Sequence, residues 1–151
     1  MLVKEIMAKN VVTVTPEMTI RELNQILKTH RISGVPVVNS ANDVVGVVTL
    51  SDILKIIAQF YNWHETDRAY YWTEEEKSGK VKKIDASYLE DIYKKSVSEI
   101  MNALVITLKE DDPAQEAMKL MFTYNIHTIP VLKDNKLVGV IGKHDLLEMS
   151  L

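Results

Sequence analysis

The sequence contains no cysteine. Without thiols there can be no disulfide framework, no thiolate zinc site and no thiol nucleophile. No apolar stretch approaches the roughly 20 residues needed to cross a bilayer, and Lys4, Glu5 and Lys9 interrupt the apolar residues at the N-terminus. We therefore expect a cytoplasmic protein with no membrane partner.

Positive charge is also in short supply, with 18 Lys and Arg against 21 Asp and Glu and a net charge of -3. Such a chain has no basic field to hold a nucleic-acid backbone, so we expect no nucleic-acid partner. No nucleophile and base, metal-ligand set or glycine-rich phosphate loop occurs at a usable spacing. His64, Glu65 and Asp67 are too close in sequence to converge on a metal as tetrahedral ligands do. We expect no enzyme activity, no catalytic residue, no cofactor and no metal.

The chain instead contains an internal repeat. The opening residues Val3, Glu5 and Met7 recur in the same order and spacing as Val97, Glu99 and Met101, and the repeat continues to the end of the chain with one turn a residue shorter. Met7 and Met101 lie among apolar neighbours, so we interpret them as core residues rather than thioether ligands. A repeat of this length decides the architecture, because each copy is one structural unit.

Each copy has the hydrophobic pattern of a β-α-β-β-α unit. In the first copy we predict strands at 11–14, 34–38 and 44–49, a helix at 19–29, and a second helix capped by Ser51 or Asp52. In the second copy we predict strands at 104–108, 128–132 and 136–141, a helix from Pro113 to Tyr124, and a final helix from Asp145. The fold class is therefore α/β, with two motifs that bury their apolar sheet faces against each other.

Two segments of each copy resemble the signature of the CBS family. These are SGVPVV at 33–38 with GVVTLSDIL at 46–54, and HTIPVL at 127–132 with GVIGKHDLL at 139–147. The resemblance implies a stand-alone tandem CBS pair, or Bateman module, whose motifs at 1–57 and 97–151 are related by a pseudo-twofold axis. It also implies clefts between the motifs and frequent dimerisation, so we expect a homodimer.

By this resemblance the ligand is an adenosyl compound, with AMP, ADP or ATP preferred over S-adenosylmethionine or NAD. A carboxylate can accept hydrogen bonds from both ribose hydroxyls, while hydroxyl groups and a helix N-terminus suit phosphate oxygens. The first cleft would be formed by Val47, Thr49, Ser51, Asp52, Ile106, Ile126 and His127. The second would be formed by Val12, Ile32, Ser33, Val140, Lys143, His144 and Asp145.

Several of these residues have a simpler interpretation. Thr49, Ser51 and Asp52 are ordinary helix-capping types, and His127 is equally compatible with a phosphate partner and with a half-buried histidine bonded to a carbonyl. Gly142 stands where the family pattern has a hydroxyl residue, although Lys143 beside it can still hold a phosphate. We therefore expect unequal clefts and favour the one that contains Asp52.

The segment at 58–96 lies outside the repeat and holds most of the aromatic residues. We predict that its first part extends the preceding helix as far as Trp72, and that Asp85 caps a helix from Ala86 to Lys95. Aromatic residues are enriched at interfaces, so this insertion either packs on a partner subunit, lies at the edge of a cleft or, slightly preferred, packs on its own domain.

The expected function is a regulatory module that binds an adenosyl ligand and signals to a separate effector protein. The alternative is a structural dimerisation module with no ligand.

Overall fold

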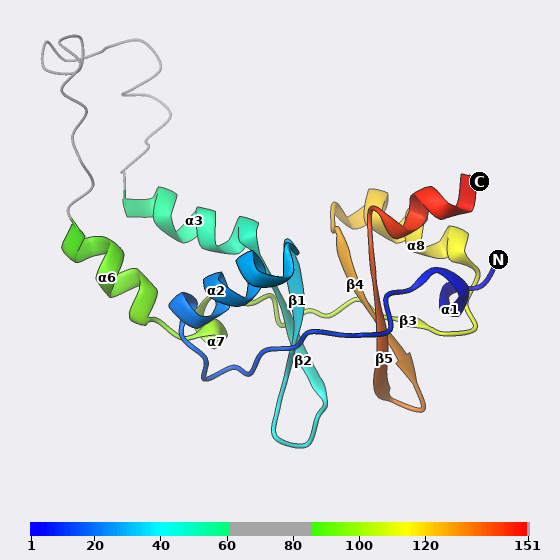
Figure 1. Cartoon of the computed structure of the whole chain (residues 1–151), viewed down its shortest axis with the longest axis horizontal. Helices are drawn as coiled ribbons and strands as arrows, with labels where there is room; N and C mark the ends of the chain where they lie inside the picture. Colours follow the sequence, from blue (N-terminus) through cyan, green and yellow to red (C-terminus); the bar gives the residue numbers. More distant parts are fainter. Residues whose placement is uncertain (61–85, 151) are drawn as a thin grey trace, which may run out of the picture.

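The computed structural model describes residues 1–60 and 86–150, and it arranges them as two units side by side along the long axis (Figure 1). The first unit contains α2 (Ile20–His30), β1 (Gly34–Val38), β2 (Val44–Thr49) and α3 (Leu50–Phe60). The second contains β3 (Leu108–Lys109), α8 (Ala114–Tyr124), β4 (Thr128–Lys133), β5 (Lys136–Gly142) and the 3-10 helix η1 (Asp145–Ser150). Three further helices are α1 (Val3–Ile6), α6 (Ala86–Lys94) and α7 (Val97–Ile100).

Each unit is built on an antiparallel hairpin. β1 pairs with β2 from Gly34↔Thr49 onward, and β4 pairs with β5 from Thr128↔Gly142 onward. Both ladders shift register at their far end, after Val37 in one and Val131 in the other. The two hairpins and the helices against them confirm the predicted α/β fold class, and the predicted strands at 34–38 and 44–49 have the observed bounds.

The first predicted strand of each copy is largely wrong. The segment at 11–14 keeps only a single parallel bridge from Val14 to Val37, and the segment at 104–108 keeps only the two-residue strand β3 beside β4. Val14 is buried, which explains the β-branched pattern, because such a run indicates an extended chain that is buried or half-buried. A strand also requires a neighbouring chain that runs alongside it, and the sequence pattern contains no information on that.

The helices follow the sequence signals more closely. Thr19 caps α2, accepting a hydrogen bond from the Glu22 N–H at 3.2 Å, while the Glu22 carboxylate accepts one from the Thr19 N–H at 3.4 Å. Pro113, which was predicted in the first turn of its helix, lies instead at the N-cap of α8, one residue before the observed first turn. The final helix is the short 3-10 helix η1 rather than an α-helix.

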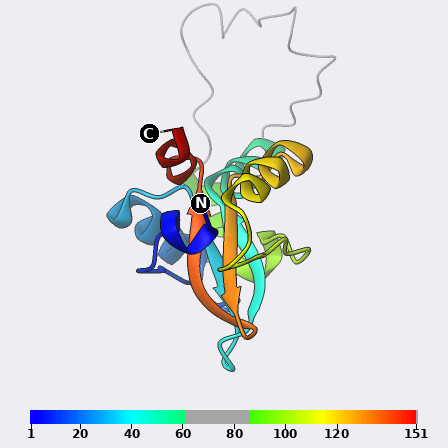
Figure 2. The same ribbon diagram turned by 90° about the vertical axis from the view of Figure 1, so that its right-hand side faces the viewer.

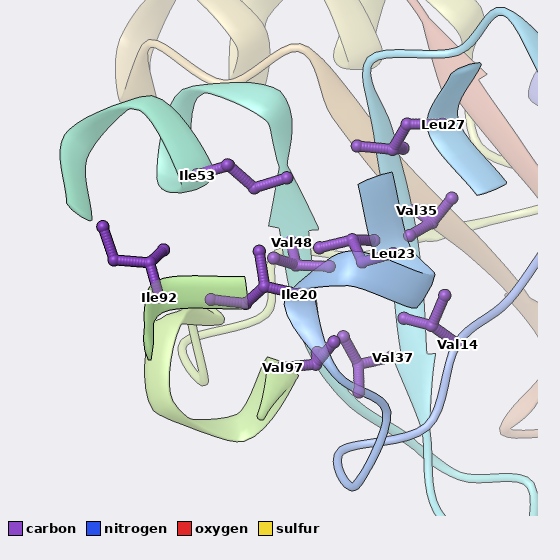
Figure 3. Packing of buried hydrophobic residues seen from close by; sticks show 10 residues of the cluster. All are labelled: Val14, Ile20, Leu23, Leu27, Val35, Val37, Val48, Ile53, Ile92 and Val97. Atoms are coloured by element: carbon purple, nitrogen blue, oxygen red, sulfur yellow. The ribbon is translucent and has the colours of Figure 1, made fainter. Parts of the chain in front are cut away.

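The core has two clusters, and each recruits the opening helix of the other copy. The first, shown in Figure 3, includes Val97 from α7, although α7 opens the second repeat. The second includes Val3 and Ile6 from α1, which opens the first repeat. Hydrogen bonds link Ala8 with Val140 at 2.9 and 3.0 Å, so the opening segments are exchanged between the motifs, across the predicted domain limits.

Glycines make room for this exchange. A Cβ at Gly46 would lie 2.7 Å from the Met101 sulfur, and a Cβ at Gly139 would collide with the Met7 sulfur. Each methionine therefore lies on a glycine of the opposite motif, where any larger residue would displace the opening segment.

An exposed ion pair adds to the exchange at the second motif. The Lys4 ammonium lies 2.6 Å from the Asp111 carboxylate. Their hydrogen bond and charges raise the pKa of Lys4 and lower the pKa of Asp111. Because both side chains are exposed, the contribution to stability is small.

The last helix of the insertion, α6, packs on the first motif. Its Ile92 is buried in the first core cluster, Glu90 lies 2.6 Å from Arg21 of α2, and Arg21 also stacks over the Tyr93 ring. The predicted helix from Ala86 is thus confirmed, and this part of the insertion packs on its own domain. The predicted cap Asp85 and the predicted extension to Trp72 lie outside the described residues, apart from the part of α3 that ends at Phe60.

Candidate functional site

The end of β2 and the start of α3 hold Asp52 in a fixed position. Asp52 is the third residue of α3, and its Oδ2 accepts hydrogen bonds from the Thr49 N–H at 2.8 Å and from the Thr49 hydroxyl at 3.1 Å. Within the described residues, Oδ1 of Asp52 takes part in no hydrogen bond. The carboxylate thus caps the helix with one oxygen and has the other available for a donor.

The second motif repeats this arrangement with one bond fewer. Asp145 Oδ2 accepts a hydrogen bond from the Gly142 N–H at 2.7 Å, and Gly142 has no hydroxyl to add a second. Both aspartates are half-buried. The two aspartates therefore differ in their hydrogen bonds, while the expected inequality of the two clefts stays a prediction. Capping and ligand binding remain compatible roles for each residue.

The motifs contact each other where β2 ends and β4 begins. An ideal Cβ at Gly34 would lie 2.6 Å from Thr128 Oγ1 and 3.0 Å from Thr49 Cγ2. The buried Thr128 side chain therefore occupies the space over Gly34 and beside Thr49. This contact crosses from one motif to the other and brings the start of β4 to the end of β2.

At this junction the two hairpins carry glycine and threonine in opposite positions. The ladder pairs Gly34 with Thr49 in the first hairpin and Thr128 with Gly142 in the second. The hydroxyl missing at Gly142 is thus matched by an extra one at Thr128. The sequence contained this signal, since Gly34 and Thr128 are equivalent in the repeat, but the repeat alone did not reveal that they touch.

The remaining predicted residues divide by exposure. His127, Ser51, Lys143 and His144 are exposed, so the interpretation of His127 as a half-buried histidine is wrong. The half-buried residues of the two predicted clefts are Val47, Ile106, Ile126, Val12, Ile32 and Val140. Val12 and Ile32 pack in part on the first core cluster and Ile126 on the second, which gives these three a packing role whatever else they do.

Backbone bonds involve two more of the predicted residues. The carbonyl of Ser33 accepts a hydrogen bond from the Leu50 N–H at 2.8 Å, and the Val47 backbone exchanges two with Asn102.

A separate groove of about 400 Å³ lies along α2 and contains none of the predicted residues. It is lined by Met18, Glu22, Gln25, Ile26, Thr29 and His30. The Glu22 carboxylate already accepts a hydrogen bond from the Thr19 N–H in the cap of α2. The other lining residues do not form a charged cluster. We therefore place the candidate site at Asp52 and Asp145, on the chemistry of the side chains rather than on the depth of the surface.

Residues 1–60 and 86–150 contain no cluster of His, Asp and Glu that could hold a metal ion. In the same part of the chain, no helix is both long and apolar enough to span a bilayer.

The model of the CBS domain family matches residues 3–59 and 97–151. The chain belongs to the CBS domain family. A crystal structure of the CBS domain pair of protein MJ0100, in complex with 5'-methylthioadenosine and S-adenosyl-L-methionine, superposes with a TM-score of 0.74. That pair is 28% identical in sequence, and the match covers 99% of this chain and 95% of the other.

Two proteins of Methanocaldococcus jannaschii are similar to this CBS pair over almost its whole length. Protein MJ1426 is 31% identical over 157 residues, covering 98% of this chain and 90% of MJ1426. Inosine-5'-monophosphate dehydrogenase is 29% identical over 145 residues, covering 95% of this chain. The chain spans only 22% of the length of that enzyme, so the similarity concerns the CBS part alone.

Proposed function

We propose that this CBS pair is a regulatory module that binds an adenosyl ligand between its motifs and transmits a change in their arrangement to a partner protein. The observation that carries the proposal is the Asp52 carboxylate, fixed at Oδ2 by two bonds from Thr49 and available at Oδ1. Its unused lone pairs suit the two hydroxyls of a ribose. The Asp52 cleft is favoured over the Asp145 cleft because its carboxylate is held by two hydrogen bonds rather than one.

The proposed lining follows the sequence prediction. The first cleft uses Thr49, Ser51 and Asp52 for the polar contacts, with Val47, Ile106, Ile126 and His127 around the base. Candidate ligands are AMP, ADP and ATP. The MJ0100 pair, which is crystallised with two adenosyl compounds that lack phosphate, supports giving S-adenosylmethionine equal standing with the nucleotides.

The exchanged opening segments supply a physical route for the signal. α1 packs on the second motif and α7 on the first, so a change in the angle between the motifs moves each of these helices relative to its own copy of the repeat. A ligand that contacts both motifs favours one angle over another to the extent that it binds that arrangement more tightly. The two arrangements present different surfaces, and the partner protein binds one of them more tightly.

Binding is tested by titration calorimetry and thermal unfolding with AMP, ADP, ATP, S-adenosylmethionine and NAD. At a hundred times its Kd a ligand stabilises the protein by about 2.7 kcal/mol, which raises Tm by roughly 5–10 °C. Asp52→Asn removes the charge while an amide oxygen remains to accept from Thr49. Because a hydrogen bond to a charged group contributes about 1.5–3 kcal/mol, we expect the Kd to rise roughly 10- to 100-fold.

Glu22→Gln is the matched control for Asp52→Asn. It alters a helix cap of the same kind, because the Glu22 carboxylate accepts a hydrogen bond from the Thr19 N–H. Glu22 has no proposed contact with the ligand. We expect this variant to bind like the wild type. If no ligand in the series binds, or if Asp52→Asn binds as tightly as the wild type, the proposal is wrong.

A second candidate function, the dimerisation module, is favoured by an apolar stripe on the helices. Phe122 is 84% exposed and Met118 42% exposed, one turn apart on α8, while Leu54 on α3 is 56% exposed. Viewed along the long axis, α3 and α8 lie on the same side of the strands (Figure 2). Large exposed apolar patches mark interaction sites, and we propose that a second copy of the chain covers this one.

Phe122→Lys tests this interface. Removing this exposed aromatic side chain and adding a charge is expected to weaken the dimer at least about tenfold, or ~1.4 kcal/mol. Sedimentation equilibrium across a concentration series measures the change. Lys28→Ala, at the equivalent position of α2, is the control and should leave the dimer intact. A wild-type chain that stays monomeric at every concentration excludes the dimerisation module.

A further inference from the structure

Two methionine sulfurs lie at the junctions where the exchanged opening segments meet the opposite motifs. The Met101 sulfur would be 2.7 Å from a Cβ at Gly46, and the Met7 sulfur occupies the equivalent place over Gly139. At both junctions the next atoms over the glycine are the Cγ of the same methionine and the carbonyl oxygen of the residue after it. Each sulfur therefore rests on a glycine, in a space too small for a further carbon atom.

The repeat preserves a thioether at this position and at no other. The chain has seven methionines, and Met7 and Met101 are the only two that occupy equivalent positions of the repeat. Each of the others stands opposite a different residue type, as Met118 does opposite Asn24. Leucine and methionine usually substitute for each other in a core at small cost. Filling of volume alone therefore gives no reason for sulfur in both motifs.

The two methionines are accessible from solvent and also embedded in the packing. Both side chains are half-buried. Met7 packs against the second core cluster and Met101 against the first. Because the chain has no cysteine, thioethers are its only sulfur groups that a peroxide can oxidise.

We propose that Met7 and Met101 are sites of reversible oxidation, and that their conversion to methionine sulfoxide releases the opening segments from the opposite motifs. In the reaction with hydrogen peroxide the O–O bond breaks and an S–O bond forms. The sulfur is oxidised by two electrons, and the second peroxide oxygen leaves as water. Methionine sulfoxide reductase reverses the change, with a dithiol that becomes a disulfide as the electron donor and with the oxygen leaving as water.

The sulfoxide does not fit the packing that the thioether makes. The glycine side has no room for an added atom, and a polar oxygen among apolar neighbours without a donor costs free energy. The residue after each methionine exchanges two hydrogen bonds with the opposite motif, Ala8 with Val140 and Asn102 with Val47, all at 2.9–3.0 Å. Displacing the methionines therefore weakens these bonds and loosens the connection between the motifs.

The test oxidises the wild type with hydrogen peroxide and maps each sulfoxide by peptide mass spectrometry. We expect Tm to fall by at least about 5 °C. We also expect the Val47 and Val140 amides to exchange hydrogen at least about tenfold faster, with a smaller change for the amides within α2. Methionine sulfoxide reductase with dithiothreitol should restore both quantities.

The double substitution Met7→Leu with Met101→Leu removes both sulfurs and keeps a similar side-chain volume. It should retain its Tm and its exchange rates after peroxide treatment. Met118→Leu is the matched control, because Met118 is 42% exposed on α8 and lies outside both junctions, and it should respond like the wild type. Should the double variant not fold, each single variant serves instead. Met7→Leu should protect only Val140, and Met101→Leu only Val47.

Three results would each overturn this inference. The first is the absence of sulfoxide at Met7 and Met101 in folded protein whose Met118 is fully oxidised. The second is an unchanged Tm and unchanged exchange once both junction methionines are oxidised, and the third is an equal loss in the leucine variants. None of these measurements uses a ligand, so the inference goes beyond the proposed function and fails or holds independently of it.

Discussion

Replacing Ile92 by alanine is expected to lower the free energy of unfolding by about 2–5 kcal/mol, the usual cost of truncating a fully buried isoleucine. Ile92 is 1% exposed and connects α6 to the first core cluster, among neighbours that α2 and α3 contribute. For a chain of this size the loss corresponds to a fall in Tm of roughly 5–15 °C. Urea unfolding monitored by circular dichroism measures it.

The control for Ile92→Ala is Asp91→Ala, next to it on α6 but exposed. Exposed substitutions outside special sites usually change stability by less than about 0.5 kcal/mol. If Ile92→Ala were as mild as its control, α6 would be an appendage rather than part of the core. The expected result instead makes α6 a structural component of the first motif.

Gly34→Ala is the second substitution with a large expected effect. Its Cβ would lie 2.6 Å from Thr128 Oγ1 and 3.0 Å from Thr49 Cγ2, at the junction of the two motifs. Overpacking of this kind costs about 1–3 kcal/mol. Gly142→Ala is the control, since its Cβ would meet atoms only at 3.7 and 3.8 Å, and we expect it to be tolerated.

Thr128→Gly should reduce the penalty of Gly34→Ala, because it removes the side chain that the new methyl group strikes. Thr128→Gly is itself destabilising in a strand, so the informative quantity is the coupling energy of the double-mutant cycle from urea unfolding. A coupling energy near zero would show that the two residues do not share the space that the structure assigns to them.

The sequence predicted the units of this fold better than their connections. The segments at 34–38 and 44–49 combine β-branched runs with a polar turn between them, and such a hairpin depends on residues that are close in sequence. The exchange of α1 and α7 depends instead on contacts between residues that are far apart in sequence. Periodicity shows which face of a helix is buried, not what buries it, so Met7 and Met101 were predicted as core residues without any indication that each lies on the opposite motif.

The candidate site was predictable to a similar degree. The positions of Thr49 and Asp52 in the sequence suggested both helix capping and ligand binding. The structure adds which carboxylate oxygen of Asp52 accepts the capping hydrogen bonds. The junction of Gly34 with Thr128 could not be predicted, because it depends on how the two motifs pack against each other.

The exchange of opening segments changes how substitutions in this chain must be assigned. A genetic map would count a variant at Met7 with the first motif, whereas the side chain lies on Gly139 of the second. A variant at Met101 would likewise be counted with the second motif and act on Gly46 of the first. Position along the polypeptide is therefore a misleading guide to which motif a lesion disturbs, and suppressors should be sought in the distant half of the gene.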